Sequence, residues 1–149
     1  MNGENASLTL TLVNQPSEIE RACTAVEEFV AARGLSPDVG YALALTLDEV
    51  VANVIRHGYA GTDEHTIRVR LWHEPDMLTM QVEDDAKAFN PLLAPPPDLD
   101  VPIDRRPIGG LGIHIMRTMM DDLEYKRVNG QNLLTLRKRV ARIEPDTVA

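Results

Sequence analysis

The sequence contains a single cysteine, Cys23, in 149 residues. No internal disulfide can therefore form, and no cysteine-based metal cluster is encoded. No apolar run reaches about 18 residues, so a transmembrane helix is not expected. The opening MNGENASLTLTL has neither a basic stretch nor a long apolar one, so we expect no secretory signal peptide. Together these absences favour a cytoplasmic protein.

Positive charge is also scarce, because 15 Lys and Arg residues stand against 23 Asp and Glu, for a net charge of −8. This balance argues against direct binding to nucleic acid, which needs clustered Lys and Arg, and against binding to an anionic membrane surface. An acidic protein can bind a polyphosphate only where the groups of the binding site itself favour negative charge. Backbone N–H groups and a metal ion would then offset the charge of the ligand.

The length and composition fit one globular domain over residues 1–149, with 44% hydrophobic and 26% charged residues. Residues 144–149 are expected to form a flexible tail. Nothing in the sequence repeats, and no linker divides it. We therefore predict a single hydrophobic core.

Apolar periodicity predicts a strand over 7–13, where leucines alternate with threonines, and then two helices. The helices occupy about 17–34 and 36–58, and the second begins with a serine cap followed by proline. We expect Gly58 to end it in a left-handed conformation. Cys23 lies on the apolar face of the first helix, where a buried core residue is favoured over a reactive thiol.

Two hairpins and a proline-rich segment follow. Alternation over 67–72 and 78–83 predicts the first hairpin. The segment 86–107 is too rich in proline for regular structure, and loops of this length are usually functional lids or disordered. A helix-like run over 113–123 and a second hairpin, turning at Asn129-Gly130, complete the chain.

This order of elements predicts an α/β (α+β) two-layer sandwich. Its sheet would be mixed or antiparallel, with about five strands and one face covered by three helices. The central helix over 36–58 is the most apolar, so we expect other elements to cover most of its surface.

Polar residues interrupt this central helix. Glu49 and Asn53 are four residues apart and so share one face, which His57 continues, whereas Asp48 points about 100° away from Glu49. A solvated stripe is the favoured reading of such residues taken alone. The alternative is that Glu, Asn and His bind a metal or activate a hydroxyl group.

Asp84 continues the strand parity of three apolar residues, Leu78, Met80 and Val82. A carboxylate on that face would be costly to bury without a partner. It either lies in water beyond the end of the strand or faces the hydrogen-bond donors of a ligand. Parity alone leaves these two readings about even.

The glycine cluster Gly109-Gly110-Leu111-Gly112 opens the last predicted helix. Glycines let the backbone approach a ligand closely, and a helix N-terminus favours phosphate. No Lys-Ser/Thr pair follows, so the cluster is not a Walker loop. It also does not follow the first strand of a βαβ unit, which excludes the dinucleotide-binding pattern.

Three segments, LTLDEVVANVIRHGY, VEDDAKAFNP and GGLGIHIMRTMMDDLEY, resemble in order and spacing the N, G1 and G2 boxes of GHKL ATP-binding domains. Within that family they are most similar to the single-domain serine kinases that act as anti-sigma factors. The resemblance extends over nearly the whole chain and implies a GHKL ATPase-like fold. The chain differs from the family at Ala86 and Ala88, where glycine is common and where alanine disfavours a positive φ.

The resemblance implies a role for each matching residue. Asn53 would coordinate Mg²⁺ at the ATP phosphates, Glu49 would be the general base, and Asp84 would accept a hydrogen bond from the adenine amino group. Residues 86–108 would form the ATP lid. The implied ATP-binding residues are Asn53, His57, Asp84, Ala86, Phe89, Gly109, Gly110, Leu111, Gly112 and Ile113.

The leading hypothesis from the resemblance is a serine/threonine kinase that phosphorylates a STAS-domain antagonist and sequesters a sigma factor or similar regulator. A PPM-type phosphatase would oppose it, and a homodimer is one of the oligomeric states left open. A second hypothesis, favoured by Ala86 and Ala88, is a nucleotide-gated adaptor without phosphotransfer. A third is a detached histidine-kinase catalytic domain, but the sequence has no dimerisation helix bearing a phospho-acceptor histidine.

Overall fold

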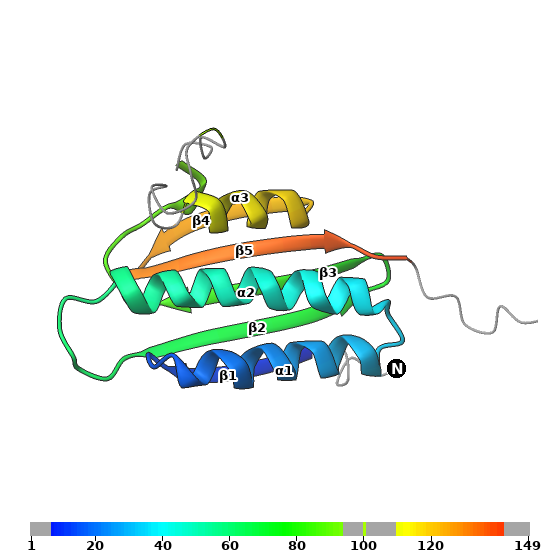
Figure 1. Ribbon diagram of the computed structural model, residues 1–149, viewed down its shortest axis with the longest axis horizontal. Coiled ribbons are helices and arrows are strands. Elements are labelled where there is room, and N and C mark those ends of the chain that lie inside the picture. The colour runs from blue at the N-terminus through cyan, green and yellow to red at the C-terminus, as the bar shows by residue number, and fades with distance from the viewer. Residues whose placement is uncertain (1–6, 94–99, 101–109, 142–149) are drawn as a thin grey trace, which may run out of the picture.

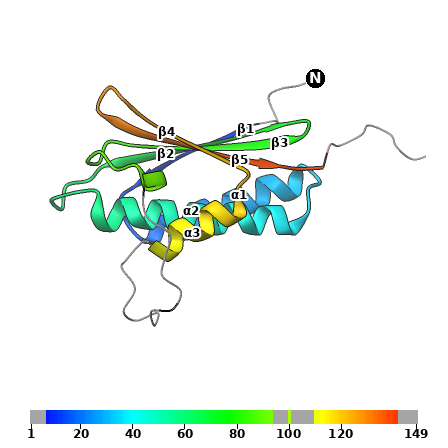
Figure 2. The same cartoon turned by 90° about the horizontal axis from the view of Figure 1, so that it is seen from above.

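The computed structural model describes residues 7–93, 100 and 110–141, with only the backbone described at 110–112. The elements are β1 (Ser7–Val13), α1 (Ser17–Ala32), α2 (Pro37–His57), β2 (Thr66–Glu74), β3 (Met77–Asp84), η2 (Pro91–Leu93), α3 (Gly110–Met119), β4 (Asp122–Val128) and β5 (Gln131–Arg139). The strands form one sheet in the order β1-β2-β3-β5-β4. Helices α1, α2 and α3 cover one face of it (Figures 1 and 2).

The predicted two-layer sandwich is confirmed, and every strand pair is antiparallel. Antiparallel pairing aligns apolar residues in rows across the helix-covered face, because side chains alternate along each strand. One such row is formed by Leu10, Val69, Val82 and Leu134. Full burial, as at Val69 and Val82, stabilises the fold by about 1.5–3 kcal/mol per side chain.

Helix α2 lies between α1 and α3 and packs against both. It begins at Ser36, whose hydroxyl accepts a hydrogen bond from the Asp38 N–H at 3.1 Å, as the cap-and-proline sequence predicts. Leu43, Leu47 and Val51 are fully buried against the sheet. Among the described residues, no helix is long and apolar enough to cross a membrane.

The prediction that Gly58 is left-handed is wrong. Its φ of −85° and ψ of −26° are right-handed helical values. Glycine is required there for lack of space, because a β-carbon at residue 58 would lie 2.6 Å from Ala86 Cβ and 2.7 Å from the Val54 carbonyl oxygen. The glycine therefore allows the end of α2 to approach the segment that follows β3.

Two boundaries also differ from the prediction. Helix α3 ends at Met119 and β4 begins at Asp122, so the apolar run over 113–123 is divided between a helix and a strand. A short 3-10 turn, η2, lies within the segment expected to lack regular structure. The second hairpin is confirmed, with φ values of 51° at Asn129 and 78° at Gly130.

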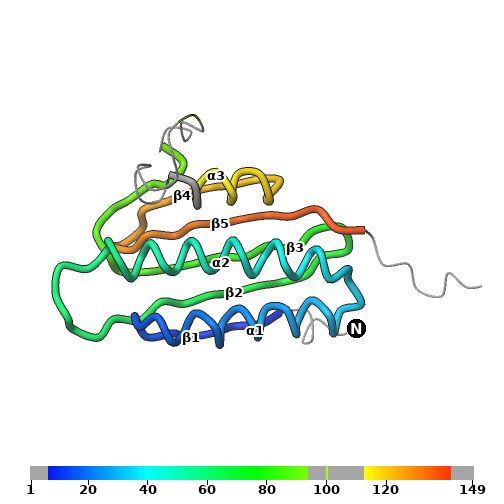
Figure 3. Tube along the Cα trace, in the orientation of Figure 1, coloured from blue at the N-terminus to red at the C-terminus, as the bar shows by residue number. Residues whose placement is uncertain are grey.

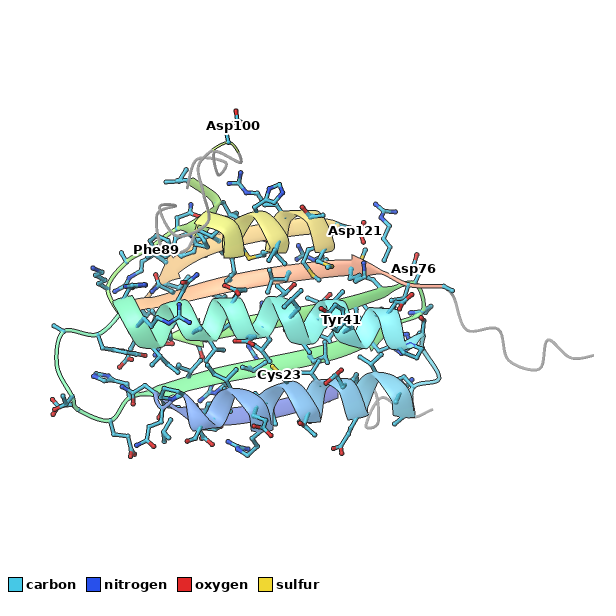
Figure 4. All side chains as sticks on the ribbon, viewed as in Figure 1. Cys23, Tyr41, Asp76, Phe89, Asp100 and Asp121 are labelled. Atoms are coloured by element: carbon cyan, nitrogen blue, oxygen red, sulfur yellow. The ribbon has the colours of Figure 1, made fainter. Side chains whose placement is uncertain are left out.

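Residues 94–99 and 101–109, which make up most of the predicted lid, lie outside the described residues, as does the predicted tail over 144–149. Cys23 is half-buried between α1 and α2 (Figure 4), and its thiol donates to the Ala44 carbonyl oxygen at 3.3 Å. Burial raises the pKa of Cys23 to about 11. The thiol therefore stays protonated at neutral pH, in agreement with the structural reading.

Candidate functional site

The C-terminal ends of α2 and β3 lie at the same end of the sheet, and α3 runs beside α2 with its N-terminal end turned toward that end (Figures 1 and 3). The Lys87 N–H donates to the Gly58 carbonyl oxygen at 3.1 Å, which joins the end of α2 to the segment after β3. The three sequence segments singled out above are thus brought together. This convergence defines the candidate site.

Asp84 lies on the helix-covered face of the sheet and is 5% exposed. Its strand position pairs it with Ile67 on one side and Asn132 on the other. Its Oδ1 accepts from the Ala86 N–H at 3.0 Å and from Asn132 Nδ2 at 2.9 Å. Burial raises the pKa of the Asp84 carboxyl, and these two hydrogen bonds counteract that rise. Of the two readings of Asp84, the solvated end of a strand is therefore wrong.

Asn132 is the principal residue of the site that the sequence analysis missed. Besides Asp84, its Nδ2 donates to the Lys87 carbonyl oxygen at 3.0 Å. Its Oδ1 accepts from the Phe89 N–H at 3.3 Å and from the Tyr125 hydroxyl. The sequence does contain one indication of this role, which is the position of Asn132 in the alternation along the strand. Asn132 lies on the same face of the strand as Leu134 and Leu136.

Arg127 completes this group by donating from its guanidinium to the Ala86 carbonyl oxygen at 2.8 Å. We call Asp84, Asn132, Tyr125, Arg127 and the backbone of residues 86–89 the Asp84 cluster. It includes the first residues of the predicted lid. Every member is held by at least one hydrogen bond to another member.

Ala86 fits its place in this cluster. The alanine is 4% exposed, and among the described residues Asn129 is the only non-glycine residue with a positive φ. The backbone at 86 therefore does not take the conformation that would demand glycine. Its methyl group instead packs against Gly58.

Glu49, Asn53 and His57 all lie in helix α2, at intervals of four residues. Glu49 and Asn53 are partly buried, while His57 and Asp48 are exposed. Within the described part of the chain, the side chains of Glu49, Asn53 and His57 have no hydrogen-bond partner and no ion pair. We call these three residues the α2 stripe; their polar groups are available to a ligand.

A metal site built from protein side chains alone is not found, since the described residues contain no group of three or more His, Cys, Asp or Glu side chains placed to hold an ion. The Asn53 amide, which has no partner among the described residues, nevertheless fits Mg²⁺, because this ion commonly takes one or two protein oxygens and completes its shell with waters and substrate phosphates. Asn53 can therefore hold such an ion together with a nucleotide.

The glycine segment is only partly described. Gly110, Leu111 and Gly112 form the first turn of α3, and Gly109 lies outside the described residues. The Ile113 side chain is buried in the core. Phe89, labelled in Figure 4, is 50% exposed. The described part of the glycine cluster thus forms the first turn of α3, whose leading N–H groups have no partner within the helix. Their role toward phosphate stays a prediction.

A second group, which sequence reasoning did not find, borders the site. The Tyr59 hydroxyl donates to Asp85 Oδ1 at 3.2 Å, and His65 Nδ1 lies 3.2 Å from Asp85 Oδ2. The rings of Tyr59 and His65 are stacked with centroids 4.2 Å apart. Burial, with the nearby Asp84 and Asp85 carboxylates, raises the pKa of Tyr59, so its hydroxyl remains a donor. Through these contacts with Tyr59 and His65, Asp85 links the loop between α2 and β2 to the end of β3.

In the comparison with known proteins, the matching family model and the matching relatives agree with one another. The family model described as "Histidine kinase-like ATPase domain" matches residues 12–138. The serine/threonine-protein kinase BtrW of Bordetella bronchiseptica is 30% identical over 96 residues, which cover 64% of this chain and 68% of that protein. The serine-protein kinase RsbW of Bacillus mycoides is 27% identical over 133 residues, with 78% and 82% covered.

Solved structures show the same fold. The crystal structure of the RsbU and RsbW domains of Rv1364c from Mycobacterium tuberculosis has a TM-score of 0.62 at 17% identity, covering 95% of this chain and 35% of that chain. The histidine kinase domain of the Erythrobacter litoralis EL346 blue-light activated histidine kinase has a TM-score of 0.53 at 15% identity, with 83% and 59% covered. This chain thus spans about a third of the mycobacterial one.

The chain belongs to the histidine kinase-like ATPase domain family, and its curated relatives are named serine-protein kinases. The predicted ATP-binding kinase domain is thereby confirmed. The roles of individual residues, the metal and the partners stay predictions.

Proposed function

We propose that the chain is an ATP-dependent serine/threonine kinase that phosphorylates a STAS-domain antagonist and holds a sigma factor or similar regulator inactive. The observation that carries this proposal is the buried Asp84 carboxylate at the end of β3, next to the segment that is hydrogen-bonded to the end of α2. In this proposal it accepts a hydrogen bond from the adenine amino group. The relatives named serine-protein kinases support the reaction class.

The order of residues along α2 supports the same arrangement. Gly58 lies beside Ala86, close to Asp84. With a rise of about 1.5 Å per residue, Asn53 lies about 7–8 Å from Gly58 along the helix axis, and Glu49 about 6 Å further. A nucleotide with its base at Asp84 would therefore extend its phosphates toward Asn53 and its γ-phosphate toward Glu49.

The proposed reaction is transfer of the γ-phosphoryl group of ATP to a hydroxyl. A bond forms between the acceptor Oγ and the γ-phosphorus, and the bond from that phosphorus to the β,γ-bridging oxygen breaks, which releases ADP. Glu49 orients the acceptor hydroxyl and takes its proton. Asn53 holds Mg²⁺, whose chemistry when bound is to offset phosphate charge. The N–H groups that open α3 donate to the phosphate oxygens.

The test is incubation with γ-labelled ATP, Mg²⁺ and a STAS-domain protein encoded near this one. Label on a serine or threonine of the STAS protein is the expected result. Binding of ATP without any transfer would instead favour the nucleotide-gated adaptor. Acid-labile label on histidine would favour the detached histidine-kinase domain.

The adaptor alternative drew on Ala86 and Ala88. Ala86 fits its site without a positive φ, and Ala88 is exposed, so neither residue now counts against ATP binding. Opposition by a PPM-type phosphatase, a homodimeric state and a cytoplasmic location belong to the same proposal.

The proposed metal role predicts that ATP binding measured by calorimetry weakens about tenfold or more when Mg²⁺ is chelated, because a charged contact is lost. The Asn53→Ala variant should show the same weak binding with or without the chelator. ATP affinity that is indifferent to chelation in the unaltered protein would remove Asn53 from metal binding.

A further inference from the structure

Asn132 occupies a position on the core face of the sheet where the neighbouring positions along β5 carry leucine. It is 6% exposed, and burial of an amide is costly unless its donors and acceptor are satisfied. The amide of Asn132 has its hydrogen-bonding groups satisfied by particular partners. Nδ2 reaches Asp84 Oδ1 and the Lys87 carbonyl oxygen, and Oδ1 takes the Phe89 N–H. One side chain therefore joins a site carboxylate to the backbone that follows β3.

The hydrogen bonds of the Asp84 carboxylate are unevenly distributed. Both donors, the Ala86 N–H and Asn132 Nδ2, end on Oδ1, and no described residue donates to Oδ2. Two donors on one oxygen fix the rotation of the carboxylate about its last torsion angle, which is otherwise broad. The second oxygen is thereby held as an acceptor in a defined direction.

We propose that Asn132 is a positioning residue that sets the nucleobase specificity of this site, by holding the Asp84 carboxylate so that Oδ2 meets an amino group of the base. The inference rests on the proposed function, in which Asp84 accepts from adenine. Asn132 does not touch the nucleotide; it acts through Asp84.

The chemistry of the purine makes this role measurable. Adenine presents an exocyclic amino donor where hypoxanthine presents a carbonyl acceptor. A fixed carboxylate oxygen favours the donor and repels the acceptor, and sites built around such a contact discriminate strongly. A carboxylate that can rotate would lose part of the contact to adenine and part of the repulsion of hypoxanthine.

The experiment compares the affinities of ADP and IDP by calorimetry for the unaltered protein, Asn132→Ala and Asn132→Leu. Leucine keeps the branched shape of asparagine, so this variant tests the amide without opening a cavity. We expect the unaltered protein to prefer ADP by about tenfold or more. Each Asn132 variant should lose at least about fivefold of that preference, since one of the two donors that fix the carboxylate is removed.

The ratio of the two affinities is the decisive quantity, because general loosening of the fold weakens ADP and IDP alike. Tyr125→Phe is the matched control, since it removes a donor to Asn132 Oδ1 and leaves the contact between Asn132 Nδ2 and Asp84 in place. We expect it to keep the ratio within about twofold. Circular dichroism would establish that each variant is folded.

Folded Asn132 variants that keep the full ADP preference would overturn the inference. A Tyr125→Phe loss as large as theirs would also overturn it, because rigidity of the cluster would then set the specificity. Equal binding of ADP and IDP by the unaltered protein would overturn the inference and the contact between Asp84 and the adenine amino group, whereas phosphotransfer to the STAS protein would be tested separately by the labelling experiment. Failure to bind any adenine nucleotide would instead contradict the proposed function itself.

Discussion

The Asp84 cluster and the α2 stripe lie at the same end of the molecule but differ in how their polar groups are satisfied. In the cluster, a buried carboxylate, an amide and the backbone of 86–89 are joined by hydrogen bonds. In the stripe, Glu49 and Asn53 have no partner among the described residues and remain partly open to solvent.

The difference follows from burial. A polar group in the core must be satisfied within the protein, whereas a half-exposed group on a helix can exchange water for a ligand at little cost. Substitutions in the cluster should therefore change stability and binding together. Substitutions in the stripe should change chemistry with little effect on the fold.

The largest effect is expected from Glu49→Ala. Loss of a general base typically slows a reaction by about 10²–10⁴-fold, so transfer to the STAS protein should fall by that factor. ATP affinity and melting temperature should stay close to those of the unaltered protein, because Glu49 has no partner among the described residues to lose. Single-turnover transfer at saturating ATP is the measurement.

Asp48→Ala is the control for that measurement, since it removes an exposed carboxylate one residue away on α2. It should leave the rate unchanged. If Glu49→Ala transfers phosphate as fast as Asp48→Ala does, Glu49 belongs to a solvated stripe and the adaptor hypothesis gains support.

A smaller effect distinguishes the two carboxylates at the end of β3. Asp84→Asn should weaken ADP binding by about 1.5–3 kcal/mol, the usual contribution of a hydrogen bond to a charged group. Asp85→Asn should cost binding less than about 1 kcal/mol, because Asp85 is exposed and acts on Tyr59 and His65. Equal losses of ADP affinity would show that Asp85, too, contacts the nucleotide.

The pH dependence of stability should test the burial of Asp84 within the cluster. Burial raises the pKa of Asp84, so its contribution to the free energy of unfolding is full below its unfolded pKa and is lost as the pH rises through the folded pKa. Asparagine does not titrate. The melting temperature of Asp84→Asn should therefore rise relative to that of the unaltered protein as the pH increases from the unfolded pKa of Asp84 through its folded pKa.

Thermal melts of the two proteins from about pH 4 to about pH 8 would span the titration of a carboxyl with a raised pKa. A constant difference between Asp84→Asn and the unaltered protein would mean that Asp84 titrates alike in the folded and unfolded states.

The sequence predicted the helices, the hairpins and the parity of Asp84, because each depends on local periodicity. Asn132 was missed because its role depends on pairing with β3, which brings together residues 48 positions apart. The end of α3 was misplaced because the apolar run continues into β4. The backbone at Gly58 was misjudged because a tertiary contact with Ala86, not a left-handed turn, requires glycine there.

The smallest effect on the ligand is expected from Ala86→Gly, which introduces the residue that the family resemblance leads us to expect at this position. The methyl group of Ala86 is buried, and glycine adds freedom to the unfolded chain, so the free energy of unfolding should fall by about 1–2 kcal/mol. ADP affinity should change less than about twofold, because the backbone at 86 has no positive φ to relieve and its N–H still donates to Asp84.

Gly58→Ala tests the other residue of the contact between Gly58 and Ala86. It should destabilise the protein more than Ala86→Gly does, since its new methyl group would meet Ala86 Cβ at 2.6 Å and the Val54 carbonyl oxygen at 2.7 Å. The double variant should recover only part of that loss, because the clash with Val54 persists. Chemical denaturation gives the free energies and calorimetry the affinities. If Ala86→Gly instead bound ADP tenfold more tightly, the alanine methyl would be obstructing the base pocket, and the nucleotide-gated adaptor would become the better reading of this chain.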